Sequence, residues 1–367
     1  MKILIDARLY GLENAGLGRY SINLIDQLSR IDTQNQYVIL LRKKYFKTLE
    51  LPSNWKKVLA DFHHYGFKEQ ILIPLIIKKE KPDLTHFLHF NVPLFAAGRF
   101  IVTIHDLLMH KNKGLEATTL SAPMYFLKRL AYSTVFKSAV TKSEKIIVPT
   151  KTIKRELVTY YKVNAEKVLP VYEGFDRKIS TKERFAFENP YFVYTGNAYP
   201  HKNLDRLIKA TLLLNESLSQ KVNLVIASSR NIFTNRLQKN INTMNAGNFV
   251  KLLGFVPDEK LGSLYKNSVA FIFPSLSEGF GLPGLEAMSS GTVVLSSEIS
   301  VFKEVYKDKV FYFNPLDVVS ISKAMKTALS LNQKRRQEII EKGKRFVSIY
   351  SWEKMAMETL GIYKSTK

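Results

Sequence analysis

Residues 269–297 predict a strand, a glycine-rich loop, a short helix and a second strand. Val269 to Pro274 is an unbroken apolar run of strand length, which is typical of a strand buried on both faces. Pro283 suits the first turn of a helix, and Gly291 suits the left-handed residue that ends one. Such a unit predicts parallel strands joined by a helix, which is the building block of a doubly wound sheet.

The same alternation extends over the rest of the chain. Short apolar runs alternate with stretches of helical periodicity, and strands are expected at residues 2–6, 37–41, 57–59, 84–86, 100–103, 145–148, 222–227, 249–252 and 309–313. With 367 residues, 46% of them hydrophobic, the chain can bury two cores. The sequence therefore predicts an α/β protein of two doubly wound, Rossmann-like domains.

A polar span of low periodicity marks the boundary between these domains. We expect an N-terminal domain over residues 1–172, a linker over 173–190, a second domain over 191–348 and a C-terminal helix over 349–367. That last helix carries an apolar stripe that predicts core packing, formed by Trp352, Met355, Ala356, Thr359, Leu360 and Tyr363.

Two carboxylates border the glycine-rich loop. Glu278 lies in the loop itself, and Glu286 lies eight positions later in the predicted helix. Glycines let backbone N–H groups approach an anion, and a helix N-terminus adds about half a positive charge. Carboxylates accept hydrogen bonds from sugar hydroxyls. The pattern therefore suits a polyol and phosphate site, with a solvated turn as the alternative.

Polar residues also follow other predicted strands. Lys202 lies near a helix start after the strand at 191–195, where a cation suits a diphosphate. His105 and Asp106 lie just past the strand at 100–103, where open parallel sheets bind ligands. A surface lysine and a structural histidine are the alternatives.

A dinucleotide-binding loop is not expected near the N-terminus. Gly11, Gly16 and Gly18 do not form G-x-G-x-x-G, and Arg42 and Lys43 end the next strand, where a ribose-binding acid would be needed. The chain contains no cysteine, which excludes disulfides and thiolate metal sites. The charged N-terminal strand argues against a signal peptide, and no charge-free run could span a bilayer. We expect a cytoplasmic protein.

The net charge of +23 is spread over both halves of the chain. Nucleic-acid binders concentrate their charge on a tail, stripe or recognition helix, so no nucleic acid is expected as a partner. Residues 122–145 combine aromatic side chains with five cations and one acid. An anionic membrane surface is therefore a candidate partner, with burial of the aromatics and a general lysine bias as the alternatives.

The stretch SLSEGFGLPGLEAMSSGTVVLSS resembles the E-x7-E signature of retaining GT-B glycosyltransferases in the glycosyl transferases group 1 family. The resemblance covers nearly the whole chain and is most specific in residues 194–204 and 274–291. It implies the GT-B architecture, in which two Rossmann-like domains face a central cleft and the last helix crosses back to the first domain. The donor would bind mainly to the second domain and the acceptor mainly to the first.

The resemblance also implies roles for individual residues. His105, Glu278 and Lys202 match catalytic positions of the family, with Asp106 supporting and with His86 and Asn91 as weaker candidates. Asn197 stands where many members carry a phosphate-binding arginine, so Arg206 or Arg19 would have to substitute. Positions that match donor contacts are Gly16, Gly18, Arg19, Gly196, Asn197, Gly279, Phe280, Gly281, Leu282 and Glu286.

The expected activity is transfer of a hexose, with retention, from a GDP- or UDP-sugar donor to a glycan or lipid-linked acceptor in envelope polysaccharide synthesis. The resemblance is mannosyltransferase-like, and no cofactor or metal is expected. Peripheral attachment to the inner face of the cytoplasmic membrane is the location that the basic segment suggests. The alternatives are a nucleotide-sugar epimerase of the same fold and a non-catalytic basic protein that binds lipid or nucleic acid.

The absence of a D-x-D motif gives a testable prediction. No two aspartates of the chain are separated by one residue, so a divalent ion on the diphosphate has no motif to hold it. Transfer should therefore keep its rate in excess EDTA, measured with a radiolabelled donor. An activity that EDTA abolishes and manganese or magnesium restores would contradict this mechanism.

Overall fold

The computed structural model describes residues 1–111, 121–176, 185, 187–229 and 231–366. The chain divides into two compact units. The first comprises Met1–Gly174 and Tyr350–Lys367, and the second comprises Phe175–Ile349. The chain thus leaves the first unit once and returns to it with its last helix.

The first unit is built on a parallel sheet of seven strands in the order β3-β2-β1-β4-β5-β6-β7. The strands are β1 Lys2–Asp6, β2 Gln36–Leu41, β3 Trp55–Leu59, β4 Leu84–Phe87, β5 Phe100–Thr103, β6 Lys145–Val148 and β7 Val168–Pro170. The order reverses between β1 and β4, as in a doubly wound sheet.

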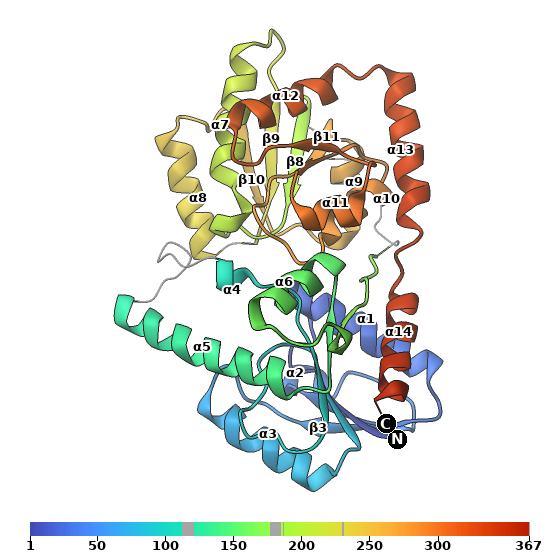
Figure 1. The fold of residues 1–367 in the computed structure, drawn as a ribbon. Coiled ribbons are helices and arrows are strands. Elements are labelled where there is room, and N and C mark those ends of the chain that lie inside the picture. The colour runs from blue at the N-terminus through green and yellow to red at the C-terminus, as the bar shows by residue number, and fades with distance from the viewer. Residues whose placement is uncertain (112–120, 177–184, 186, 230, 367) are drawn as a thin grey trace. The chain divides into compact units, whose positions relative to one another are not determined.

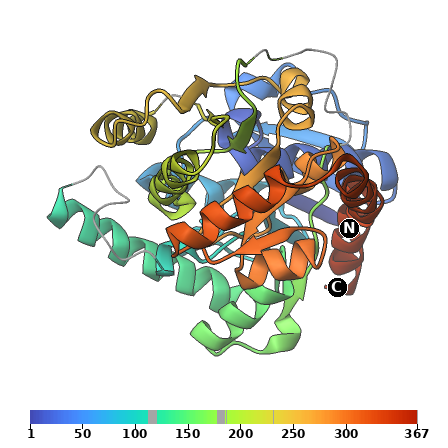
Figure 2. The same cartoon turned by 90° about the horizontal axis from the view of Figure 1, so that it is seen from above.

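Helices cover the faces of this sheet (Figure 1). They are α1 Ala15–Ile31, α2 Lys43–Phe46, α3 Phe67–Glu80, α4 Leu108–Lys111, α5 Ala122–Lys142, α6 Lys151–Tyr161 and the final helix α14 Trp352–Ser365. Two short 3-10 turns, Leu12–Asn14 and Ala165–Lys167, precede α1 and β7. In Figures 1 and 2 both chain termini lie on the same side of this unit.

The second unit contains a parallel sheet of six strands in the order β10-β9-β8-β11-β12-β13. The strands are β8 Tyr191–Thr195, β9 Asn223–Ala227, β10 Val250–Gly254, β11 Ala270–Phe273, β12 Val294–Ser297 and β13 Phe311–Phe313. The 3-10 turn Pro200–Lys202 precedes the first of its helices, which are α7 Leu204–Glu216, α8 Ile232–Thr243, α9 Asp258–Lys266, α10 Leu282–Ser289, α11 Ser300–Tyr306, α12 Val318–Leu329 and α13 Gln333–Val347.

The prediction of two doubly wound α/β units is confirmed by these sheets. The elements that the sequence did not predict are the strand β7 and the helices α2, α4, α8, α11 and α13. The sequence of α13, QKRRQEIIEKGKRFV, is highly charged, but its few apolar residues, Ile339, Ile340, Phe346 and Val347, recur at helical spacing. Over the described residues, no helix combines the length and the apolar character needed to cross a bilayer.

The last helix is fixed to the first unit by buried polar contacts. The hydroxyl of Tyr363 lies 2.6 Å from Nδ1 of His86, and Nε2 of His86 lies 2.8 Å from the hydroxyl of Thr103. Burial lowers the pKa of His86 to about 3, so the ring is neutral and donates one hydrogen bond while accepting the other. A Cβ on Gly174 would lie 2.2 Å from the backbone nitrogen of Trp352, so the start of α14 needs glycine there. His86, a weaker site candidate, is thus a core residue.

Candidate active site

The second unit has its topological switch point between β8 and β11. These two strands pair with each other in parallel. On its other side β8 pairs with β9, and β11 pairs with β12, so the chain proceeds in opposite directions across the sheet from this point. Open α/β sheets bind ligands in the crevice beyond the carboxyl ends of the strands at such a point. The loops that follow these two strands, residues 196–203 and 274–281, contain the predicted lysine and glutamate.

Lys202 and Glu278 form an ion pair at this point. The Nζ atom of Lys202 donates to Oε1 of Glu278 at 2.5 Å, and each side chain is only 12% exposed. The lysine nitrogen lies 5.5 Å from the centre of the Phe273 ring, which adds a cation–π contact. The backbone N–H of Leu276 donates to the carbonyl of His201 at 2.8 Å and holds the two loops together. Residues 76 positions apart in sequence therefore share one site.

Asn203 fixes the loop that carries the lysine. Its backbone is left-handed, with φ at 61°, a conformation that asparagine tolerates better than most residues. Its buried Nδ2 donates to the carbonyls of Pro274 at 3.0 Å and Pro315 at 2.7 Å. Arg206, a candidate phosphate-binding cation, donates from Nη1 to Oδ1 of Asn203 at 2.9 Å. The sequence analysis did not single out Asn203, although its left-handed preference directly after Lys202 was a signal.

The glycine-rich loop packs against a tyrosine of α11. A Cβ on Gly281 would lie 2.4 Å from the hydroxyl oxygen of Tyr306, and so would one on Gly284. That hydroxyl donates to the carbonyl of Gly281 at 2.5 Å, and φ of Gly281 is 109°. These two glycines are therefore required by packing, a reason that the sequence analysis did not consider. Phe280 and Leu282 bury their side chains, so contacts to a ligand would have to come from their backbone.

The remaining second-unit candidates lie close to the same two loops. Gly196 and Asn197 follow β8 directly, and the hydroxyl of Tyr194 donates to the carbonyl of Asn197 at 2.7 Å. Burial, reinforced by the charge of Glu278, raises the pKa of Tyr194 well above its usual value. Burial and the neighbouring Lys202 lower the pKa of His201 to about 4. Glu286 lies on α10 and is 5% exposed.

His105 occupies the corresponding edge of the first unit, beyond β5. Its Nε2 lies 3.0 Å from the carbonyl of Leu88, to which it donates, and its Nδ1 lies 3.3 Å from Oε1 of Glu173. The edge of its ring meets Tyr20 at a centroid distance of 4.7 Å. The side chain is 12% exposed, and both nitrogens have partners within the first unit. Glu173, which the sequence analysis missed, is thus the residue that orients this ring.

The N-terminal glycines differ in their surroundings. A Cβ on Gly18 would lie 1.8 Å from the carbonyl oxygen of Gly11, so the start of α1 can pack there only with glycine. Gly16 is exposed, with open space around it. Arg19 lies half-buried on α1. Among the weaker candidates, Asp106 accepts the backbone N–H of Leu108 at 2.9 Å and so starts α4.

A buried ionic cluster lies at the switch point of the first unit. Arg8 donates to Asp6 from Nε at 2.8 Å and from Nη2 at 2.7 Å, and its Nη1 lies 3.5 Å from Oε2 of Glu69. The other carboxylate oxygen of Glu69 accepts from the amide of Asn91. One guanidinium cannot neutralise two buried carboxylates. Burial accordingly raises the pKa of Glu69 to about 7, while Arg8 and its hydrogen bonds help to lower that of Asp6.

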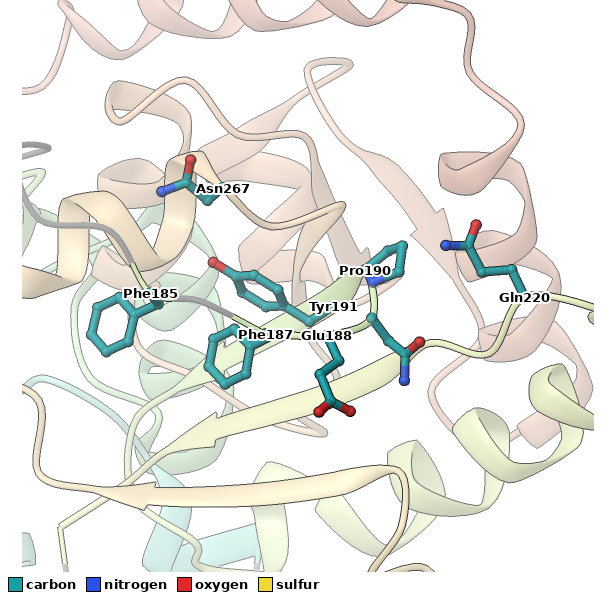
Figure 3. Close-up of a pocket in the computed structure, with 8 residues that line it drawn as sticks. Phe185, Phe187, Glu188, Pro190, Tyr191, Gln220 and Asn267 are labelled. Carbon is teal, nitrogen blue, oxygen red and sulfur yellow. The ribbon is translucent and has the colours of Figure 1, made fainter.

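The second unit also has a pocket that does not lie at the switch point. A cavity of about 450 Å³ is lined by Phe185, Phe187, Glu188, Asn189, Pro190, Tyr191, Gln220 and Asn267 (Figure 3). Tyr191 is the first residue of β8, so the cavity lies at the amino end of a strand whose carboxyl end leads to Lys202. It is therefore separate from the candidate site.

Two protein families match this chain, and each match covers most of one compact unit. Residues 175–346 match the family described as Glycosyl transferases group 1, and residues 15–178 match the family described as Glycosyltransferase Family 4. The chain is 26% identical over 366 residues to the O-antigen chain mannosyltransferase RfbU of Salmonella typhimurium, which covers 96% of this chain and 97% of the relative.

Solved structures resemble the whole chain. Sucrose-phosphate synthase from Thermosynechococcus elongatus has a TM-score of 0.77 at 16% identity, covering 100% of this chain and 98% of the other. HepE of Anabaena, in complex with UDP and glucose, has a TM-score of 0.72 at 17% identity and covers 100% of both chains. These likenesses concern the fold.

The buried cluster gives a prediction about stability. Folding raises the pKa of Glu69 from 4.5 to about 7. The stability that this group contributes to the folded state is therefore fully present below pH 4.5, and it is lost as the pH rises through 7. Glu69→Gln cannot ionise, so this loss should disappear. The free energy of unfolding of the wild type, measured in urea, should fall relative to the variant by about 2–3 kcal/mol between pH 4.5 and pH 8.

Because all other groups titrate in both proteins, the difference between the two curves isolates Glu69. Glu338→Gln, which changes an exposed carboxylate of α13, is the control and should leave the wild-type profile unchanged. Parallel curves for the wild type and Glu69→Gln would contradict the raised pKa.

Proposed function

The chain belongs to the glycosyl transferases group 1 family of glycosyltransferases, and on that premise we propose that it transfers a hexose, with retention, from a nucleotide diphosphate sugar. The acceptor in this proposal is a glycan or a lipid-linked glycan of an envelope polysaccharide. The similarity to a mannosyltransferase of O-antigen chains supports mannose and this acceptor class. The UDP and glucose complex of HepE supports a nucleotide-sugar donor, with UDP and GDP as the bases to test.

Two predictions from the sequence are confirmed at this point. The fold class is GT-B, because the structural neighbours that span the whole chain have that fold. The chain is an enzyme of the glycosyltransferase class, because both family matches and the curated relative agree on it.

The Lys202–Glu278 pair at the β8/β11 switch point is the observation that carries the proposal. In the reaction, the bond between the anomeric carbon and the leaving diphosphate oxygen breaks, and the acceptor oxygen bonds to that carbon on the same face. The acceptor proton passes to the departing diphosphate. Lys202 neutralises the negative charge that develops there, since a fixed cation in a little-exposed site stabilises such charge without reorganisation.

The other residues divide between sugar, ribose and phosphates. Glu278 holds hydroxyls of the donor sugar, and Glu286 holds those of the ribose. His105 contacts the donor sugar after giving up Leu88 or Glu173 as a hydrogen-bond partner. The backbone around Gly196, Asn197, Gly279, Phe280, Gly281 and Leu282 binds the donor, with Gly16, Gly18 and Arg19 on the first unit. No metal ion and no cofactor take part in this mechanism.

The location follows from the acceptor class. A lipid-linked acceptor is held in a membrane, so the enzyme would work at the inner face of the cytoplasmic membrane without spanning it. The proposed location therefore depends on the proposed lipid-linked acceptor.

The two glutamates should differ in their kinetic effects. A contact to the reacting sugar strengthens in the transition state, whereas a ribose contact stabilises the ground and transition states more evenly. Glu278→Ala should therefore mainly lower kcat, and Glu286→Ala should mainly raise the KM for the donor. Each loss should cost about 2–4 kcal/mol in kcat/KM. Steady-state transfer from UDP- and GDP-hexoses measures both.

Glu278→Gln separates sugar binding from the ion pair. The amide keeps hydrogen bonds to hydroxyls but removes the charge that faces Lys202, so it should retain more activity than alanine. Glu338→Ala, at an exposed position of α13, is the matched control. Wild-type kinetics in both Glu278→Ala and Glu286→Ala would refute the assignment.

A further inference from the structure

Large apolar side chains are exposed on one part of the first unit. On α3, Phe67 is 92% exposed, although the same helix buries Ile73 and Ile77 against the sheet. Phe95, in the loop after β4, is 80% exposed. Helix α5 buries Phe136 and still exposes apolar residues over its first half. The exposed set is Phe67, Ile71, Leu72, Leu75, Phe95, Met124, Phe126, Leu127 and Leu130.

The elements that carry these residues contact one another. The N–H of Leu94 donates to Oε1 of Gln70 on α3 at 2.9 Å. Lys142 of α5 donates from Nζ to the carbonyl of the same Leu94 at 2.9 Å. The ring of Phe90 meets Tyr132 of α5 edge-on at a centroid distance of 4.9 Å. The loop after β4 therefore joins α3 to α5, and Figure 1 draws the two helices along the same side of the sheet.

We call this face the α3–α5 surface, and its charge has one sign. Its cations are Lys68, Lys78, Lys79, Lys128, Arg129, Lys137 and Lys142. The acids of α3 are Glu69 and Glu80, which are 0% and 5% exposed, and α5 has none. Glu80 is already paired with Lys2 and Lys56. Within the described parts of these two helices, exposed charges are thus all positive.

We propose that the α3–α5 surface docks on an anionic lipid bilayer. The exposed aliphatic and aromatic side chains enter the boundary between headgroups and acyl chains, and the lysines bind lipid phosphates. This inference deepens the proposed function, on which it rests for the lipid-linked acceptor, by assigning the membrane contact to specific residues.

The observations favour a bilayer over other occupants. A second copy of the chain would bring the same seven cations against these seven, which is repulsive. A nucleic acid would meet bare apolar side chains, such as Phe95 and Leu127, where it needs phosphate contacts. The helices have 14 and 21 residues and so extend about 21 and 31 Å, a width that suits a lipid surface. Helices that lie in a membrane interface typically combine exposed apolar side chains with lysines and arginines, as these two helices do.

Two sets of substitutions test the two halves of the proposal. Lys78, Lys79, Lys128 and Lys137 change to glutamine in the charge variant. Ile71, Leu75 and Leu127 change to serine in the apolar variant. The charge control changes exposed lysines of the second unit to glutamine, namely Lys239, Lys266, Lys326 and Lys334. The apolar control changes Ile232, Leu316 and Val319, exposed on the same unit, to serine.

The measurement is co-sedimentation with vesicles of phosphatidylcholine alone or with one quarter phosphatidylglycerol. The wild type should bind the anionic vesicles at least tenfold more tightly than the neutral ones, and less tightly as salt is added. Each surface variant should lose at least tenfold in affinity for the anionic vesicles, and each control less than twofold. Thermal unfolding verifies that every variant is folded.

Absence of wild-type binding to anionic vesicles, which would favour a protein partner for this surface, overturns the proposal. Equal losses in the surface and control variants overturn it as well. Transfer to a soluble acceptor should be unchanged in the charge variant, so failure of docking and failure of the enzyme activity are distinguishable. Vesicle binding without transfer from any donor would refute the proposed function and leave the docking surface standing.

Discussion

The contact between Lys202 Nζ and Glu278 Oε1 joins the loops that leave two neighbouring strands at the switch point of the second sheet. Holding two charges with only 12% exposure each is costly unless further contacts support them. Phe273 lies below the ammonium group, and Asn203 ties its loop to the end of β11. The paired state keeps the lysine in place. In the proposed mechanism, an incoming diphosphate replaces the carboxylate as its partner, and the carboxylate turns to sugar hydroxyls.

The fold was predictable because its strands are short apolar runs between turn residues. The unit around β11 illustrates this, since Pro283 lies in the first turn of α10 and Gly291 has the left-handed φ of 85° that was expected after it. Helix α13 was missed, although its apolar residues Ile339, Ile340, Phe346 and Val347 recur at helical spacing within a highly charged sequence. Its position depends on long-range contacts, such as the one that Arg336 makes with the carbonyl of Val269 at 2.6 Å.

The site was predictable only in part. The sequence, with the family resemblance, singled out Lys202 and Glu278, but nothing local indicates that they touch, because 76 residues separate them. Glu173 and Asn203 were missed because an orienting carboxylate and a loop-fixing amide have no periodicity of their own. Exposure and burial, the two alternatives for the apolar residues of α5, each hold for part of the helix, since Tyr125 and Phe136 are buried while Phe126 and Leu127 are exposed. The middle of α3, residues 71–77, is apolar all round and so has more apolar surface than one sheet can cover.

A crystal structure of the protein with bound UDP or GDP tests the central claim most directly. The account predicts that a diphosphate oxygen lies within hydrogen-bond distance of Lys202 Nζ, beyond the carboxyl ends of β8 and β11, and that Lys202→Met abolishes this placement or weakens nucleotide binding at least tenfold. A diphosphate bound elsewhere, with the Lys202–Glu278 contact unchanged, would contradict it.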